Sequence, residues 1–230
     1  MKKIIRKLLY PFSYTCSQAG QDHWVMCEVH NEKKNGFFVD IGAHDGIEIS
    51  NTYLLEKRLG WDGLCIEANP ETFTQLARNR GVRCVHACVD SSEAPLTFLK
   101  RGMSGGIVAE DTDNPTSSIA GQTISIDGKS LSRILDENKA PAVIDYLSID
   151  VEGAEDRVLL DFDFSRYVFL SITIERPSEA LRSKLAENKY HLIKEIPDLD
   201  CFYLHDSIVS EYRARMVAFY GKKFIRIRWR

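Results

Sequence analysis

Four carboxylates end apolar, strand-like runs in this chain of 230 residues: Asp40, Glu67, Asp150 and Glu175. In a parallel sheet covered by helices, the carboxyl ends of the strands meet at one edge, and ligands bind there. A carboxylate at that edge can hold an ammonium group, accept hydrogen bonds from sugar hydroxyls or take up a proton. The four residues therefore predict a polar ligand site at one edge of a sheet.

Asp40 opens the segment DIGAHDG, residues 40–46. Gly42 allows the backbone to approach a ligand closely, and the helix that follows offers free N–H groups. The spacing Asp-x-Gly-x-x-x-Gly differs from the G-x-G-x-x-G of dinucleotide-binding proteins, which argues against NAD. It leaves room for an amino-acid moiety that carries an ammonium. A tight strand-to-helix turn without a ligand is the alternative interpretation.

Glu67 closes the second apolar run, 27 residues after Asp40. A carboxylate at this position can accept hydrogen bonds from both ribose hydroxyls of a nucleoside. A solvated turn residue is the alternative, but the two acids together favour a nucleoside ligand. The third strand, which we expect to end at Cys88–Asp90, would then lie near the base.

Asp150 lies in the segment YLSIDVEGAE, residues 146–155, where three carboxylates crowd one strand-to-helix turn. For Glu152 and Glu155 the alternative interpretation is the favourable electrostatics of a helix N-terminus. Asp150 instead ends a buried strand, as Glu175 does in the next one. We expect Asp150, Glu175 and Glu152 to form the polar floor of an acceptor site, with Asp150 and Glu175 acting as a base or as oxygen ligands of Mg²⁺ or Mn²⁺.

Alternation of strand-like and helix-like runs from residue 36 onward predicts an α/β fold. No linker is evident, so we expect one domain, divided into a helical segment (1–35) capping the cofactor site, a core (36–205) and a basic tail (206–230). The expected strands are 37–41, 64–67, 83–89, 96–99, 123–126, 144–150, 168–175 and a hairpin of 190–196 with 200–205. The expected helices are 51–59, one capped by Asn69 and ending before Gly81, 130–138, one starting at 154, and 179–187. Residues 101–121 are rich in Gly, Ser, Thr and Asp, which is typical of a functional loop such as a lid.

Basic residues concentrate at the two ends of the chain. Residues 1–10 carry four and residues 213–230 carry seven, with no acidic partner, while residues 11–212 hold the other nineteen against all thirty-three Asp and Glu, a net charge of −14. Such an acidic body disfavours nucleic acid as a partner, whereas the ends suit peripheral contact with an anionic membrane. Residues 1–12 have one apolar helical face, which fits packing on the domain or on a membrane surface and is too short for a signal peptide or a membrane span. The six cysteines contain no Cys-x-x-Cys pair, which favours a reducing compartment, the cytoplasm.

Over about residues 13–205 the chain resembles the FkbM-type methyltransferases. The resemblance rests on Ser17–Asp22, DIGAHDG with Ser50–Thr52, Glu56-Lys57, Gly60-Trp61, Ile66–Pro70, Ser104–Ile107 and Leu147–Gly153. It implies a Rossmann-like class I methyltransferase fold: a mostly parallel central sheet, a C-terminal antiparallel hairpin and helices on both faces. It also implies S-adenosylmethionine as the cofactor, and many members of the family methylate hydroxyls of sugars or of polyketide-like products.

The resemblance assigns roles by position. Asp40 and Gly42 would lie beside the methionine moiety, and Glu67 would hold the ribose. Gln18, Gln21 and Asp22 would close the pocket from the N-terminal segment, and the same cavity would be lined by Ser50, Asn51, Ala68, Cys88 and Asp150. Where relatives often read Glu-His-Asn, this chain has Glu175-Arg176-Pro177, so a family-wide histidine at that place is in doubt, and His44 or His205 is the substitute to consider.

The function expected from the sequence is O-methylation of a hydroxyl on a sugar or glycan with S-adenosylmethionine as methyl donor. A small-molecule or lipid-linked acceptor is one alternative, and a non-catalytic nucleoside-binding module with the same fold is another. An NAD-dependent enzyme is disfavoured by the missing G-x-G-x-x-G. A nucleic-acid methyltransferase is disfavoured by the acidic body and by the lack of an Asn-Pro-Pro-aromatic motif.

Overall fold

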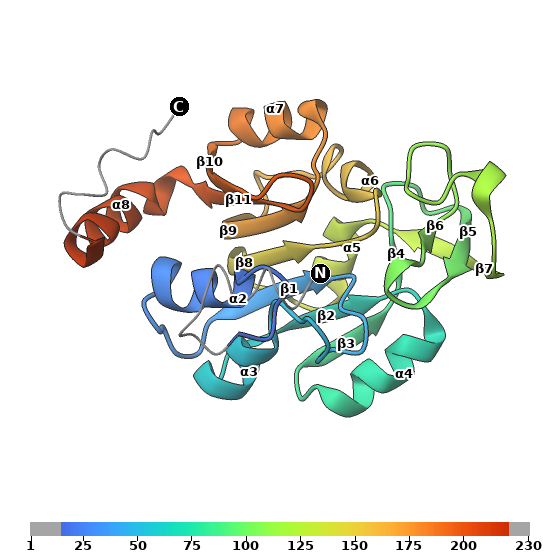
Figure 1. Ribbon diagram of the computed structural model, residues 1–230, viewed down its shortest axis with the longest axis horizontal. Helices are drawn as coiled ribbons and strands as arrows, with labels where there is room; N and C mark the ends of the chain where they lie inside the picture. The colour runs from blue at the N-terminus through green and yellow to red at the C-terminus, as the bar shows by residue number, and fades with distance from the viewer. Residues whose placement is uncertain (1–14, 221–230) are drawn as a thin grey trace.

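The computed structural model describes residues 15–220, and a seven-stranded sheet of order β10-β11-β9-β8-β1-β2-β3 forms its centre (Figure 1). The strands are β1 (Phe37–Ile41), β2 (Asp62–Glu67), β3 (Arg83–His86), β8 (Val143–Ile149), β9 (Val168–Glu175), β10 (Tyr190–Glu195) and β11 (Asp200–His205). β1, β2, β3, β8 and β9 pair in parallel, whereas β11 is antiparallel to both β9 and β10. The predicted α/β fold with a mostly parallel sheet and a terminal hairpin is confirmed. The strand order reverses between β1 and β8, which is where such sheets bind ligands.

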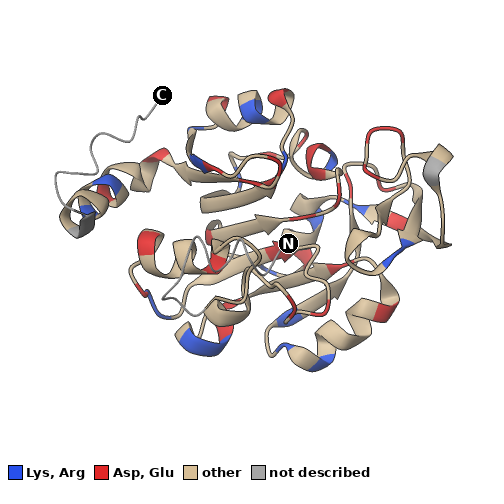
Figure 2. Ribbon diagram, in the orientation of Figure 1, with Lys and Arg blue, Asp and Glu red and all other residues tan. Residues whose placement is uncertain are grey.

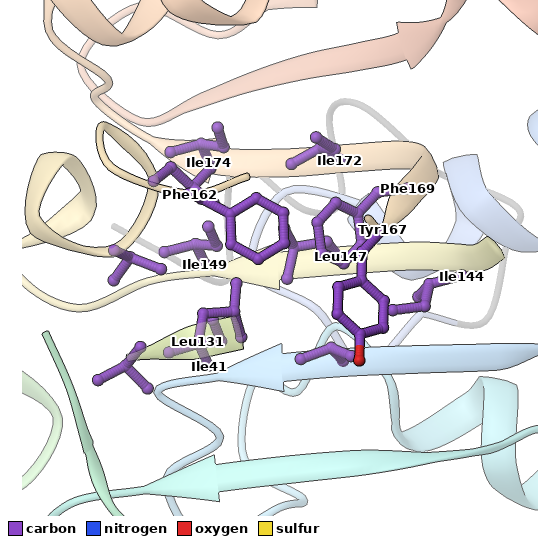
Figure 3. Packing of buried hydrophobic residues seen from close by; sticks show 14 of the residues in the cluster. Ile41, Leu131, Ile144, Leu147, Ile149, Phe162, Tyr167, Phe169, Ile172 and Ile174 are labelled. Carbon is purple, nitrogen blue, oxygen red and sulfur yellow. The ribbon is translucent and has the colours of Figure 1, made fainter. Parts of the chain in front are cut away.

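Helices cover both faces of the sheet because alternate strand residues point to opposite sides. In β1, Val39 and Ile41 belong to one apolar cluster and Phe38 to the other. The first cluster includes apolar residues of α5 (Leu131–Glu137), α6 (Glu155–Leu159) and α7 (Glu179–Glu187). Figure 3 shows Phe162, Tyr167 and Phe169 packed within it against the strands. The second cluster takes residues from α3 (Tyr53–Leu59), α4 (Pro70–Asn79), the π-helical segment η1 (Trp24–Val29), which follows the short helix α2 (Gln21–His23), and α8 (Asp206–Tyr220).

Helix α4 begins after Asn69 and ends before Gly81, as predicted. The Asn69 side chain accepts a hydrogen bond from the Glu71 backbone N–H at 3.0 Å, and Pro70 occupies the first turn. At the other end Arg80 leaves the helix in an extended conformation with its N–H on the Leu76 carbonyl. Gly81 therefore does not form a left-handed cap, and the helix ends where Arg80 turns inward.

A second, four-stranded sheet flanks the first, with strand order β4-β7-β5-β6. Its strands are β4 (Cys88–Val89), β5 (Pro95–Lys100), β6 (Gly106–Ile107) and β7 (Gln122–Lys129), and the segment between β5 and β7 also holds the short 3-10 turns η2 (Gly102–Ser104) and η3 (Thr116–Ser118). The single strand predicted over residues 83–89 is wrong, because the chain changes sheets at Ala87. The Ala87 N–H still donates to the Glu67 carbonyl at 3.2 Å, whereas Cys88 already pairs with Gly128.

Figure 2 shows many of the charged residues on the helices and loops, whereas long stretches of the strands are uncharged. The basic residues and apolar face predicted for residues 1–12, and the basic residues of the tail after residue 220, lie outside the described residues. Residues 206–220 form α8, which packs Val209 and Tyr212 against the second apolar cluster. Between residues 15 and 220, none of the helices has the length and apolar character needed to span a membrane.

Candidate functional site

A cavity of about 900 Å³, measured with its open mouth, lies at the carboxyl ends of β1, β2 and β8. Its wall also includes the start of β4 and residues 102–107 of the segment predicted to act as a lid. The edge of the sheet where the sequence placed the ligand is therefore hollow.

Most of the residues predicted to form the site line this cavity, although they come from five separate stretches of chain. The lining includes Asp40, Gly42, Ser50, Asn51, Glu67, Ala68, Cys88, Asp150 and Glu152. Gln18, Gln21, Asp22 and Glu175 are not part of the lining.

The turn after β1 approaches the turn after β8 very closely at Gly42. Gly42 has φ +80°, and a Cβ atom there would lie 1.9 Å from the Asp150 carbonyl oxygen. The Gly42 and Ala43 N–H groups both donate to the Ile66 carbonyl, each at 3.0 Å. These contacts bring the ends of β1, β2 and β8 together, so that Asp40 and Asp150 face one cavity.

The Glu67 carboxylate is held in place by two backbone N–H groups. Its Oε1 accepts from Asn69 at 2.7 Å, and its Oε2 accepts from His44 at 2.9 Å. Burial raises the pKa of Glu67, and these two hydrogen bonds act in the opposite direction. Each carboxylate oxygen keeps a further lone pair for a ligand hydroxyl.

Asp40 is 4% exposed and accepts a 2.6 Å hydrogen bond from the Thr52 hydroxyl. Burial raises the pKa of Asp40, whereas Thr52, the charge of Arg80 and Ser148 lower it. A buried carboxylate that faces a cavity suits a cationic ligand group, because the cation would compensate for the lost solvation.

Two polar atoms in the cavity wall have no hydrogen-bond partner among the described residues: His44 Nδ1 and Asn51 Oδ1. The other end of the Asn51 amide donates to Ser148 Oγ at 3.0 Å, which fixes the direction in which Oδ1 points. Buried polar atoms normally have partners, so such atoms indicate a polar ligand. Together with Asp40 and Glu67, they fit a ligand that carries both an ammonium group and hydroxyls, as S-adenosylmethionine does.

An acidic cluster, made of Asp150, Glu152, Glu175 and Asp200, lies at the ends of β8, β9 and β11. Antiparallel pairing places Asp200 opposite Glu175. The Asp150 residue lines the cavity and is exposed to it, and the protein around it and the charges of Glu175 and Glu152 raise the pKa of its carboxyl. Burial likewise raises the pKa of Asp200 to about 7. Glu175 follows Ile174, the β9 partner of Ile149, and forms an ion pair with Arg176 at 3.1 Å.

Glu155 serves the turn after β8 and not the cavity. Its Oε1 accepts from the Val151 N–H at 3.1 Å and the Gly153 N–H at 3.4 Å. Burial raises the pKa of Glu155 to about 7. This matches its interpretation as a residue of the helix N-terminus.

The three residues predicted to close the cavity from the N-terminal segment have different surroundings. The Asp22 carboxylate accepts hydrogen bonds from Cys16 N and Ser17 Oγ, both at 2.6 Å, and so organises its own loop. Gln21 Nε2 donates to Asp200 Oδ2, which links this segment to the acidic cluster. Gln18 is partly buried and lies away from the cavity lining.

Sequence reasoning missed several residues that shape the site. Ser148 lines the cavity and accepts from Asn51, but it stands near the end of an apolar strand and no local pattern marks it. Phe98 and Met103 form an apolar part of the wall. Thr52 and Arg80 support Asp40 from behind, and no local pattern marks Arg80, which stands one residue beyond a helix.

Metal binding was predicted for Asp150 and Glu175. Over residues 15–220 no three His, Cys, Asp or Glu side chains are grouped in a way that could hold a metal ion. These two carboxylates would therefore need water or substrate oxygens to complete a coordination sphere.

The family model of the methyltransferase FkbM domain matches residues 40–193. No curated protein matches the sequence significantly. Among solved structures, the METTL16 MTase domain (crystal form 2) is 12% identical to this chain, with a TM-score of 0.47. The match covers 80% of this chain and 66% of the METTL16 chain, so this chain spans slightly less than two thirds of the length of the METTL16 chain. The N-terminal domain of human METTL16 in complex with SAH is 10% identical with a TM-score of 0.40, over 80% and 68% of the two chains. A methyltransferase from Pyrococcus furiosus is 16% identical with a TM-score of 0.41, over 88% and 92%.

Proposed function

This chain belongs to the methyltransferase FkbM domain family, and from that premise we propose that it methylates a hydroxyl group on a sugar or glycan. Membership makes it an S-adenosylmethionine-dependent methyltransferase. The acceptor and the atom that receives the methyl group are the parts that we infer from the site.

The cofactor is assigned to the part of the cavity between Asp40 and Glu67. Asp40 would bind the ammonium of the methionine moiety, and Glu67, held by two backbone N–H groups, would accept from the ribose hydroxyls. The cofactor supplies a methyl group on a positively charged sulfur. The residues around it hold it in place, and Cys88, buried at the start of β4, contributes to the wall beyond Glu67.

The observation that carries the proposal is the Asp150 carboxyl, which faces the cavity and has a strongly raised pKa. A hydroxyl is a weak nucleophile near neutral pH and benefits from a base whose pKa is close to the working pH. Asp150 would accept the proton that the acceptor hydroxyl loses while its oxygen bonds to the methyl carbon and the carbon–sulfur bond breaks. The walls of the cavity would hold the two reactants in line.

Asp150 with Glu175 could instead bind Mg²⁺ or Mn²⁺ that orients the acceptor oxygen. Activity that disappears with a chelator and returns with the metal would favour this arrangement over the metal-free base. A lipid-linked acceptor is supported by the eleven basic residues at the ends of the chain, which suit contact with an anionic membrane.

Calorimetric binding of S-adenosylmethionine, with and without Mg²⁺ or Mn²⁺, tests the cofactor site first. We expect Glu67→Ala and the shape-preserving Glu67→Gln to bind at least about tenfold more weakly than wild type, because hydrogen bonds to a charged acceptor are lost. Glu71→Ala is the control, since Glu71 lies on the adjoining helix and its side chain is 68% exposed.

A screen of glycan, small-molecule and lipid-linked hydroxyl acceptors follows. Methyl transfer to a sugar hydroxyl would support the proposal, and transfer only to another acceptor class would contradict the sugar assignment. Cofactor binding without product on any acceptor would favour the non-catalytic module. Absence of cofactor binding under every condition would overturn the assignment of the site.

A further inference from the structure

Arg80 places a guanidinium in the interior directly behind the cofactor side of the cavity. Its side chain is fully buried, with 0% exposure, and it forms a 2.5 Å ion pair with Glu56 of α3. The guanidinium also lies over the ring of Phe38 in β1, 5.4 Å from the ring centre. A buried charge is costly unless its surroundings compensate for the lost water, so this position calls for an explanation.

The guanidinium binds the chain that leaves the β1 turn. Nη1 donates to the Gly46 carbonyl at 3.3 Å and to Ser50 Oγ at 3.4 Å. Both Nη1 and Nη2 donate to Thr52 Oγ1 at 3.1 Å. Arg80 thereby ties together the beginning and the end of residues 46–52, the stretch that includes the cavity-lining Ser50 and Asn51.

The contact with Thr52 fixes the direction of a hydroxyl proton. A guanidinium has donors only, so the Thr52 oxygen must accept from it. The single Thr52 proton is then left for Asp40 Oδ2, which lies 2.6 Å away. Arg80, Thr52 and Asp40 form a chain of hydrogen bonds that ends on the carboxylate assigned to the cofactor ammonium.

Gly46 makes room for this arrangement. It has φ +79°, and a Cβ atom there would lie 2.7 Å from Arg80 Cγ and 2.6 Å from Leu76 Cδ1. The second glycine of the DIGAHDG segment thus allows the Arg80 side chain to pass under the turn. The sequence predicted that this segment faces a ligand, with a tight turn as the alternative, and in the structure its end packs against Arg80.

We propose that Arg80 is a positioning residue of the cofactor site: it orients the Thr52 hydroxyl toward Asp40 and thereby holds the Asp40 carboxylate in place and charged. The inference rests on the proposed function, in which Asp40 binds the cofactor ammonium. Arg80 itself is not part of the cavity lining.

The other groups around Asp40 determine which protonation step would be seen when cofactor binding is measured as a function of pH. Arg80 and the Thr52 and Ser148 hydroxyls lower the pKa of Asp40. Cys65, the partner of Asp40 on β2, and Tyr146 on β8 interact electrostatically with the Asp40 carboxylate. Burial raises the pKa of both groups well above their usual ranges. Cys65 and Tyr146 therefore stay neutral near neutral pH, and Asp40 is the group of this set that would lose its charge on acidification.

The test measures S-adenosylhomocysteine binding by calorimetry between about pH 5 and about pH 8. We compare wild type with Thr52→Val, Arg80→Gln, Arg80→Lys and the Thr52→Val/Arg80→Gln double variant. The control is Arg78→Gln, an exposed arginine on α4. Loss of either donor raises the pKa of Asp40, so the pH below which binding weakens should rise by about one unit.

The double variant should shift by less than the sum of the two single shifts, because Arg80 acts partly through the Thr52 hydroxyl and partly through its own charge. Arg80→Lys should recover the shift only in part, since an ammonium lacks the planar pair of donors. A purely structural role would weaken binding equally at every pH and lower the melting temperature.

Midpoints that equal the wild-type value, or shifts that add in the double variant, would overturn the proposal while leaving the proposed function intact. Lack of S-adenosylhomocysteine binding by wild type at every pH would overturn both. Arg80→Lys keeps a cation at the site, so it tests the role of Arg80 even where Arg80→Gln fails to fold, and Thr52→Val keeps the size of the side chain while it removes the hydrogen bond to Asp40.

Discussion

Aspartates of this protein differ in role because their neighbours differ. Asp22 is saturated by backbone and hydroxyl donors of its own loop. Asp40 accepts from Thr52 and faces the cavity with a nearby cation behind it. Asp150 faces the same cavity, and the surrounding protein and then the charges of Glu175 and Glu152 raise its pKa. The charge of Arg80 and the Thr52 hydroxyl lower the pKa of Asp40, whereas neighbouring carboxylates raise the pKa of Asp150. Asp40 is therefore suited to bind a cation, and Asp150 is suited to accept a proton.

Asp150 and Glu175 can be separated by their effects on turnover. We expect Asp150→Asn to lower kcat by at least about 100-fold because it removes the base, with S-adenosylhomocysteine affinity changed by less than about threefold. Glu175→Gln removes a like charge, which lowers the pKa of Asp150 and moves the acid limb of kcat/KM to lower pH by roughly half a unit to one unit. The pH–rate profile of both variants measures this.

Glu179→Gln is the matched control, since that side chain is 96% exposed at the start of α7. Unchanged kcat in Asp150→Asn would remove the base from the mechanism. An acid limb that moves upward in Glu175→Gln would show that Glu175 acts on Asp150 other than through its charge.

Neighbouring turns of the sheet are packed against each other so tightly that specific residues are required at the contacts. The turn after β1 meets the turn after β8 at Gly42. The turn after β8 in turn meets residues 106–114, where the Asp113 N–H donates to the Glu152 carbonyl at 3.0 Å and a Cβ at Gly153 would lie 2.7 Å from Asp113 N. The cavity walls are therefore positioned by contacts between turns as well as by the strands.

A comparison of Gly42→Ala with Gly102→Ala separates the destabilisation caused by a steric collision from that caused by backbone strain. Both glycines have positive φ, +80° and +57°, but a Cβ at Gly102 would meet nothing within 4 Å. We expect Gly102→Ala to lower the free energy of unfolding by about 1 kcal/mol through backbone strain alone. Gly42→Ala should lower it by about 3 kcal/mol or more, because the new methyl group collides with the Asp150 carbonyl. Urea denaturation measures both, and equal losses would refute the close approach of the two turns.

Two sheets are joined into one molecule around the cavity. The chain passes from the large sheet to the small one at Ala87, and a third apolar cluster (Cys88, Phe98, Ile107 and Ala154) lies between them. Arg157 of α6 adds an ion pair to Asp90 at 3.0 Å and another to Asp111 at 2.8 Å. The Asp90 side chain is 2% exposed, so the carboxylate of this ion pair is buried, whereas the Arg157 side chain is 26% exposed.

Arg157→Ala tests how strongly this connection stabilises the molecule. We expect the free energy of unfolding to fall by about 2–3 kcal/mol, because Asp90 would be left buried without a cation. Arg133→Ala is the comparison, since Arg133 pairs only with the exposed Glu93 and Glu137 and should show no measurable change. Equal stability of the two variants in urea would indicate that the Asp90 pair contributes nothing.

Elements that depend on local pattern were predicted from the sequence alone. The bounds of β1, β9, α7 and β11 match the expected ranges, because an apolar run or a helical repeat determines each one locally. The same reasoning brought Asp40, Glu67 and Asp150 to one place, since carboxyl ends of parallel strands share an edge. Fold class and the centre of the site are thus determined by the sequence read in short windows.

Contacts between distant segments were decided only by the tertiary structure. Gln21 meets Asp200 across 179 residues of chain, and the antiparallel register of β11 brings Asp200 beside Glu175. The change of sheet at Ala87 and the inward turn of Arg80 beneath Gly46 likewise have no local signal. Side-chain packing and strand register set these contacts, and both depend on residues far apart in the sequence.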